Sequence, residues 1–344
     1  MVKFRNRYTE IFTHREYGRK DKIMNLNFQQ AYDLFILSRE EYCQDTTISN
    51  YKNTLRYFLS FMEEHRGVPV KEIDIETIDK TDLSAYTLYL REKPKFKNHP
   101  FNAELKSTIS KRSIRTYQVD VRTFFNFLFN EEYIKKELTK KYKIIKAESK
   151  VIVPLSVDDV AILDGLYNPK CEMGLRNLCL IHLMLDAGLR RSEVINLELS
   201  HVNFDHNYII VVNGKGSKDR TVPLAPRLKK MLYTYAIAYR PACDHEYFLC
   251  NGNLDNTQLT ENAIKMLFSR MIKHTELKRL YPHLLRHTFA TAYIMQGGDL
   301  ESLRIYLGHT DISITQKYLH LATQYGTLNY DVYKLDKKFF RRYS

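Results

Sequence analysis

The chain has 344 residues, which exceeds the usual size of one hydrophobic core and predicts two domains. Apolar residues make up 44% and charged residues 27%, a balance typical of a folded protein with little extended disorder. The 53 lysines and arginines against 40 acidic residues give a net charge of +13. This charge favours a polyanionic partner such as nucleic acid, although a basic composition alone does not decide it.

Cysteine content and hydropathy further limit the classes of protein to which the chain can belong. The five cysteines are an odd number and contain no C-x-x-C pair, so we expect neither a disulfide framework nor a structural zinc site. The N-terminus lacks an apolar stretch long enough for a signal peptide, and the longest apolar run, near 178–185, is too short to span a bilayer. The sequence therefore predicts a cytoplasmic protein without membrane association.

The first half of the chain is predicted to be helical. Residues 1–26 form a basic tail without clean periodicity, and their shortness predicts that no further DNA-binding domain precedes the helical one. Apolar residues then recur at steps of three and four over 46–64, behind Thr46 or Thr47 as the N-cap, and again over about 111–129. We expect a helical domain over 27–145.

Positive charge is concentrated before the middle of the chain. Between Arg91 and Lys150 there are 16 lysines and arginines against seven acidic residues. A basic linker is predicted at 146–153, which is either a solvated connection or a strap that follows DNA. Ser156 with Asp159 resembles a capping box that opens the first helix of a second domain, 154–344.

The second half mixes helices with a β-hairpin. Residues 177–187 are predicted to form a buried helix that ends at Gly188, and a further amphipathic helix is predicted to follow it. The β-branched segment 208–212 and the segment 221–224 predict two paired strands, with Lys215 at the hairpin tip.

Four short segments combine polar groups that neither a core nor a surface requires. They are G-L-R-R-S-E at 188–193, G-K-G-S-K at 214–218, H-L-L-R-H at 283–287, and L-G-H-T at 307–310, with Tyr318 nine residues after the histidine of that last segment. In H-x-x-R the two side chains stand three apart, so on a helix they share a face and can contact one phosphate together. Each segment alone is unspecific.

In order and spacing, these segments together resemble the tyrosine recombinase (phage integrase) family, which includes the bacterial Xer-type recombinases and mobile-element integrases. The resemblance covers about residues 27–335. It places the catalytic residues of the family on positions that are all filled in this chain: Arg190, Lys215, His283, Arg286, His309 and Tyr318, with Glu193 as the acidic partner that orients an arginine.

The resemblance implies a reaction that these residue types suit. Attack on a phosphodiester builds negative charge on the non-bridging oxygens, which the guanidinium groups of Arg190 and Arg286 can neutralise with paired donors. His309 would donate a further hydrogen bond, and His283 would accept the phenol proton or hold the same oxygens. Tyrosine has a pKa of about 10 and needs such help to act as a nucleophile. Lys215 would protonate the leaving 5′ oxygen, which leaves a 3′-phosphotyrosyl bond without metal, ATP or cofactor.

Simpler interpretations exist for each residue. Adjacent Arg190 and Arg191 could serve only solvation, and Lys215 could be an ordinary turn residue. His283 and His287 stand four apart, a spacing that can bind zinc, but no third ligand is obvious. A lone tyrosine is usually packing, so Tyr318 depends on its distance from His309.

The resemblance implies a mostly helical fold with a small antiparallel sheet, arranged as a two-domain clamp on DNA: a helical, SAM-like core-binding domain and a catalytic domain. A terminal helix after Gly326 would dock into a neighbouring protomer of a homotetramer or pack on its own domain. Strand exchange would pass through a Holliday junction on double-stranded sites, with possible accessory factors. The alternatives are a type IB topoisomerase, a non-cutting DNA-binding protein of the same fold and, with least support, an RNA-binding protein.

Overall fold

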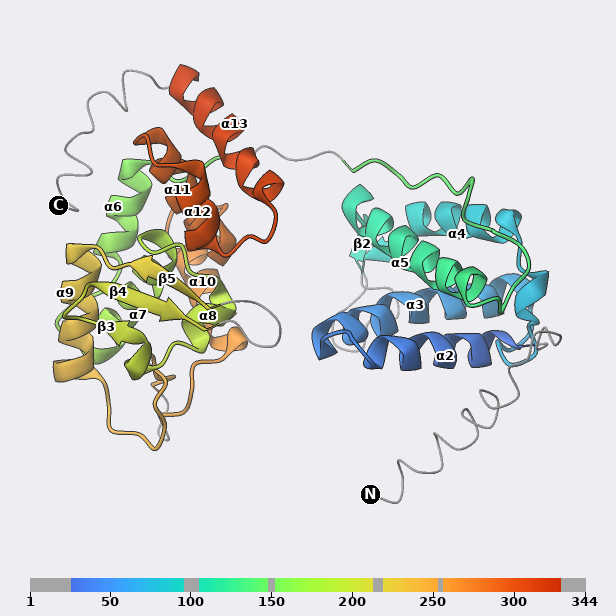
Figure 1. Cartoon of the computed structure of the whole chain (residues 1–344), viewed down its shortest axis with the longest axis horizontal. Coiled ribbons are helices and arrows are strands. Elements are labelled where there is room, and N and C mark those ends of the chain that lie inside the picture. Colours follow the sequence, from blue (N-terminus) through green and yellow to red (C-terminus); the bar gives the residue numbers. More distant parts are fainter. Residues whose placement is uncertain (1–25, 96–104, 148–151, 213–218, 253–255, 329–344) are drawn as a thin grey trace. The chain divides into compact units, whose positions relative to one another are not determined.

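The chain separates into two compact units, residues 1–150 and 151–344, and each is described by itself (Figure 1). The computed structural model describes these residues: 26–95, 105–147, 152–212, 219–252 and 256–328. Lys215 and most of the predicted terminal helix lie outside them. The predicted fold class is confirmed, since both units are mainly helical and the sheets are small and antiparallel. In the described part of the chain, no helix has the length and apolar character needed to cross a membrane.

The first unit is a helical domain with a short two-stranded sheet. Its elements are α2 (Phe28–Glu40), α3 (Asp45–Arg66), η1 (Ile75–Thr77), α4 (Lys80–Glu92), β1 (Pro94–Lys95), β2 (Leu105–Thr108) and α5 (Lys111–Asn130). The predicted helix over 111–129 is confirmed, and Ser110 caps it by accepting from the backbone N–H of Ser113. The predicted cap of α3 is wrong: the helix begins at Asp45, and its N-cap residue Gln44 makes no side-chain cap.

Aromatic rings fill the core of this first unit. The Phe58 ring is fully buried and packs edge-on against Phe28, Tyr86 and Phe125, with ring centroids 4.8–5.9 Å apart. Offset and edge-to-face pairs of this kind add to the stabilisation that burial alone provides. The stripes that predicted the helices are therefore the faces that meet in this core.

The first helix of the second unit begins at the predicted capping box, where Ser156 and Asp159 each accept from the other's backbone N–H. Its helices are α6 (Val157–Gly165), α7 (Glu172–Leu185), α8 (Arg191–Ile195), η2 (Leu199–His201), α9 (Pro226–Thr234), the π-helical turn η3 (Tyr235–Tyr239), α10 (Glu261–His274), α11 (Pro282–Met295), α12 (Leu300–Leu307) and α13 (Ile312–Leu328). Its strands are β3 (Val202–Asn203), β4 (Tyr208–Val211) and β5 (Arg220–Pro223).

The predicted hairpin is confirmed. β4 pairs antiparallel with β5, with Val211 opposite Arg220, and β3 pairs on the other side of β4. Along β5 the side chains alternate, so Arg220 and Val222 are buried while Thr221 and Pro223 are exposed. An arginine thus occupies a core-facing position.

Helix α7 runs through the centre of this unit, and nearly all of its residues are buried. It is longer at its start than the predicted 177–187 and ends at Leu185. The amphipathic helix that was expected to follow is the short α8. At the other end of the chain, α13 continues past Gly326, where the sequence predicted a break before a new helix.

Candidate active site

Helix α11 carries three of the polar side chains of interest. Pro282 starts the helix at a position where a missing N–H costs nothing. His283 is exposed at its first turn and has no hydrogen bond to a described residue, whereas Arg286, one turn later, is 4% exposed. His287 follows on the half-buried side.

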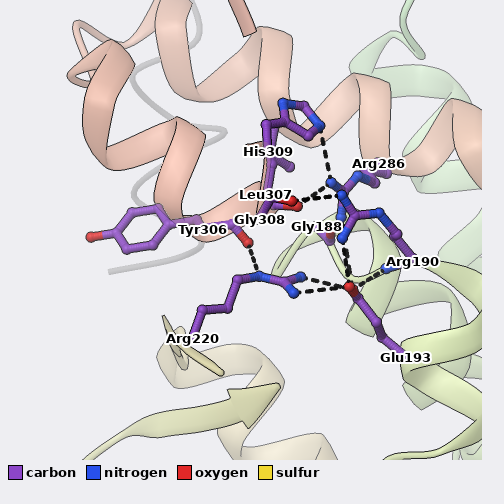
Figure 2. A network of polar contacts seen from close by, with 9 residues as sticks. All are labelled: Gly188, Arg190, Glu193, Arg220, Arg286, Tyr306, Leu307, Gly308 and His309. Carbon is purple, nitrogen blue, oxygen red and sulfur yellow. Dashed lines mark hydrogen bonds and ion pairs between the residues drawn. The ribbon is translucent and has the colours of Figure 1, made fainter. Parts of the chain in front are cut away.

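The Arg286 guanidinium binds two backbone carbonyls and a histidine (Figure 2). It donates to Gly188 O at 2.6 Å, to Leu307 O, and to Nε2 of His309 at 3.3 Å. The three partners come from the turn before α8, from the last residue of α12 and from the turn after it. Arg286 therefore ties the G-L-R and L-G-H segments, more than a hundred residues apart in sequence, into one site.

At the start of α8, the Glu193 carboxylate accepts from both the backbone and the side chain of Arg190. The Arg190 backbone N–H donates to Glu193 Oε2 at 2.7 Å, and the Arg190 Nη1 donates to Oε1 at 2.7 Å. The second Nη atom donates to Gly308 O at 3.0 Å, yet 32% of the Arg190 side chain stays exposed. Arg190 is thus held in place and still open to a ligand.

A third arginine, Arg220 of β5, completes the network, and sequence reasoning missed it. Its two Nη atoms bind the two Glu193 oxygens at 2.8 and 2.7 Å, and its Nε donates to Tyr306 O at 2.7 Å. Since all its nitrogens are used within the protein, Arg220 positions Glu193 and α12. The signal that could have found it is an arginine at a core-facing position of a β-strand.

Two glycines make this packing possible. Gly188 and Gly308 both have positive φ angles, 64° and 62°, which favour glycine. A Cβ on Gly188 would lie 2.4 Å from the Phe289 ring, and one on Gly308 would lie 3.0 Å from the Arg220 guanidinium. Their carbonyls accept from Arg286 and Arg190, so both glycines shape the arginine site directly.

The charges in this network do not balance. Arg190, Arg220 and Arg286 face one carboxylate, Glu193, which is an excess of two positive charges among the described residues. Burial raises the pKa of Glu193, but the hydrogen bonds and charges of Arg220 and Arg190 outweigh this and lower it to about 2. Burial and the neighbouring Arg190 lower the pKa of Arg286 to about 9. An anion bound here would relieve this repulsion.

Tyr318 lies beside this cluster, in the same chain. It projects from α13, is 5% exposed, and packs with Ala290, Leu303 and Leu307. Its hydroxyl is 2.8 Å from Nδ1 of His287. Burial raises the pKa of Tyr318, and this outweighs the positive charges of Arg286 and Arg190, which lower it.

His309 lies between the tyrosine and the arginines. Its ring is parallel to that of Tyr318, with an interplanar angle of 8° and centroids 6.4 Å apart. Nε2 accepts from Arg286, so the proton of the neutral ring is on Nδ1, which donates to Thr315 Oγ1 at 2.9 Å. Burial and the arginine charges lower the pKa of His309 to about 4, which keeps the ring neutral.

Of the predicted site residues, the structure brings Arg190, Arg286, His309 and Tyr318 together, with Glu193 between the arginines. Lys215 lies outside the described residues, on the connection between β4 and β5. His283 lies on α11 but does not contact the tyrosine hydroxyl. That contact belongs to His287, which the sequence singled out only as a possible zinc ligand.

Comparison with known proteins agrees with this geometry. The description "Phage integrase family" matches residues 144–325, and "Phage integrase SAM-like domain" matches residues 27–144. The chain belongs to the phage integrase family. It is 27% identical over 280 residues to tyrosine recombinase XerD of Listeria monocytogenes, covering 80% of this chain and 88% of the relative. It is also 27% identical over 304 residues to tyrosine recombinase XerC of Staphylococcus aureus, covering 87% and 93%.

Solved structures show the same fold. The Tn1549 transposon integrase bound to circular intermediate DNA superimposes with a TM-score of 0.66 at 17% identity, covering 85% of this chain and 95% of that one. XerH bound to its difH substrate gives a TM-score of 0.62 at 18% identity, covering 90% and 91%. The prediction of a tyrosine recombinase is confirmed: the chain is a site-specific recombination enzyme of this family, and the topoisomerase alternative is not favoured.

Proposed function

We propose that this recombinase cleaves DNA through attack by the Tyr318 hydroxyl on a phosphodiester held by Arg190 and Arg286. The observation that carries the proposal is the uncompensated positive charge beside a buried tyrosine. A phosphodiester supplies one negative charge, and the charge on its non-bridging oxygens grows during attack. Guanidinium groups fixed in advance stabilise that growth without rearranging.

Cleavage exchanges one phosphoester bond for another. A bond forms between the Tyr318 oxygen and phosphorus, and the bond from phosphorus to the 5′ oxygen breaks, which leaves a 3′-phosphotyrosyl link. The phenol proton passes to a base, and Lys215 gives a proton to the leaving 5′ oxygen. Because the phosphotyrosyl link retains the energy of the broken bond, a free 5′ hydroxyl from the partner strand can reverse the step.

Contacts in the site favour His287 over His283 for the phenol proton. Nδ1 of His287 lies within hydrogen-bond distance of the hydroxyl, and burial together with the nearby His283 lowers the pKa of His287 to about 4. At neutral pH the His287 ring is therefore neutral, and its Nδ1 can accept the hydroxyl hydrogen of Tyr318. His309, neutral and stacked beside Tyr318, would bind a non-bridging oxygen.

We further propose that both units bind duplex DNA, the helical one over 27–145 and the catalytic one over 154–344, with the basic segment 146–153 as their linker. The charge excess between residues 91 and 150 supports phosphate contacts, so binding should weaken steeply with salt. Exchange of four strands through a Holliday junction requires four protomers, and accessory factors could set direction. Action on chromosomal or mobile-element DNA places the protein in the cytoplasm, at the nucleoid.

A trapping experiment tests the nucleophile without knowledge of the DNA site. A library of nicked suicide duplexes is incubated with the protein, covalent complexes are isolated after denaturation, and the trapped DNA is sequenced. Wild-type protein should trap a defined sequence and Tyr318→Phe should trap none. The matched control Tyr306→Phe removes a half-buried hydroxyl twelve residues away and should trap as wild type does. Equal trapping by Tyr318→Phe would refute the proposal.

A further inference from the structure

A cluster of thiol and imidazole groups lies outside the recombination site, in the connection between η3 and α10. Cys243, His245 and Cys250 place one potential ligand atom each within 4.8 Å of one another. No other group of three such side chains occurs among the residues that the structure describes. The sequence predicted no zinc site because its five cysteines are an odd number without a C-x-x-C pair, but the fold brings together two cysteines that are seven positions apart.

Two of the three ligand-atom distances in the cluster are close to those of a tetrahedral metal site, and all three are within 4.8 Å. Two thiolates bound at about 2.3 Å to one zinc ion lie about 3.8 Å apart, and a thiolate and an imidazole nitrogen about 3.6 Å apart. The Cys243 and Cys250 sulfurs are 3.7 Å apart, and the Cys243 sulfur is 3.8 Å from His245 Nδ1. A disulfide would need sulfurs at about 2.05 Å.

The tautomer of His245 is fixed in the form that a metal requires. Its Nε2 lies 2.8 Å from the carbonyl oxygen of Asn256, which can only accept, so Nε2 carries the proton. Nδ1 then presents a lone pair toward the cysteines. Metal-binding histidines commonly donate their other ring N–H to a carbonyl in this way.

The segment that would hold the metal also supports α8. Phe248 N donates to Leu197 O at 2.6 Å, Leu199 N donates to Glu246 O at 2.9 Å, and the Arg176 guanidinium donates to the Cys250 carbonyl at 3.0 Å. The two backbone contacts join the segment to the chain just after α8, the helix that carries Glu193, and the Arg176 contact joins it to α7. Within the described part of this connection, regular pairing is limited to the isolated bridges Glu198–Tyr247 and Cys250–Gln258, so a bound metal would add stability where regular structure is sparse.

We propose that Cys243, His245 and Cys250 bind a zinc ion, with a water molecule in the fourth position. Thiolate and imidazole ligands together select zinc over the hard cations, which prefer oxygen. None of the three residues takes part in the proposed DNA cleavage, so the site would act on stability.

Metal binding by the full chain tests this. Protein purified under reducing conditions is stripped with a chelator and titrated with Zn²⁺ alone, followed by thermal unfolding, and with Co²⁺, whose thiolate charge-transfer bands report cysteine ligands. We expect one metal per chain, cobalt–thiolate bands, and an unfolding temperature that rises with zinc. Cys243→Ser and His245→Gln should each weaken zinc binding at least tenfold and abolish the rise.

The control is Cys171→Ser, which alters an exposed cysteine of the same unit and should bind zinc as wild type does. Cys243 and His245 are only half-buried, so their substitution leaves the core intact. Three results overturn the proposal: no cobalt–thiolate bands in the wild type, unchanged zinc affinity in both variants, or a Cys243–Cys250 disulfide in the purified protein that persists under these reducing conditions and excludes zinc.

Discussion

The two units bury different kinds of side chain. In the first, phenylalanine and tyrosine rings pack with aliphatic side chains, and the buried charged residues among those described are Asp82 and Lys93, with no arginine. In the second, Arg176, Arg220 and Arg286 are all at most 7% exposed, as is His182. Apolar burial stabilises wherever it occurs, whereas a buried charge costs free energy unless it is paired.

This difference separates stability from function. The aromatic core needs only to hold its helices together, so it can be chosen for packing alone. The buried arginines of the second unit are oriented by carbonyls and by Glu193, and they retain excess charge, which weakens the apo protein and prepares it for an anion. Substitutions should therefore change stability in one unit and cleavage in the other.

The largest expected effect is on the first unit. Phe58→Ala removes a fully buried ring and should lower the free energy of unfolding of this unit by about 3–5 kcal/mol. Hydrogen exchange followed by mass spectrometry should show faster exchange confined to residues 26–147. Leu88→Ala, at a side chain that is 58% exposed, is the control and should change little. Equal loss of protection in both units would contradict the comparison.

Among substitutions that keep the Tyr318 nucleophile, cleavage should respond most strongly to Arg286→Lys. A lysine keeps the charge but cannot bind Gly188 O, Leu307 O and a phosphate together, so the rate of covalent complex formation should fall about 10²–10³-fold. Arg191→Lys alters a neighbouring exposed ion pair and should cleave nearly as wild type does. Single-turnover cleavage at saturating protein measures both, and a normal rate for Arg286→Lys would remove this arginine from the reaction.

Much of this site was predictable from sequence, and the missing parts share a cause. Arg190, Arg286, His309 and Tyr318 stand in short segments whose spacing identifies them. Arg220 belongs to no such segment, and only the strand register shows that it points inward. The contact between His287 and Tyr318 joins two helices 31 positions apart, which local spacing cannot predict.

Buried His182 of α7 should make the stability of the second unit depend on pH. It lies 2.8 Å from both Asp186 and Asp164; burial lowers its pKa, but these carboxylates outweigh that and raise it to about 9. Because the pKa is raised in the folded state, protonated His182 stabilises the folded unit fully below the unfolded pKa of about 6.5. This stabilisation of about 3 kcal/mol is lost as the pH rises through about 9. Denaturation between pH 6 and 9.5 should show this slope, and His182→Gln should abolish it. A wild-type slope that persists in the variant would mean that other groups cause it.

The smallest expected effect concerns His287, whose hydrogen bond to Tyr318 is the contact that sequence reasoning missed. His287→Phe keeps a ring but removes the acceptor, so the cleavage rate should fall by roughly fivefold to tenfold, the equivalent of about 1 kcal/mol. His287→Gln can still accept the hydrogen and should recover part of the rate. Because burial and the nearby His283 lower the pKa of His287 to about 4, it stays neutral between pH 6 and 9, and the loss should be the same across that range. A loss of rate that changes with pH in this range would show that His287 titrates during the reaction. If His287→Phe cleaves as fast as wild type, His283 would be the residue that accepts the phenol proton.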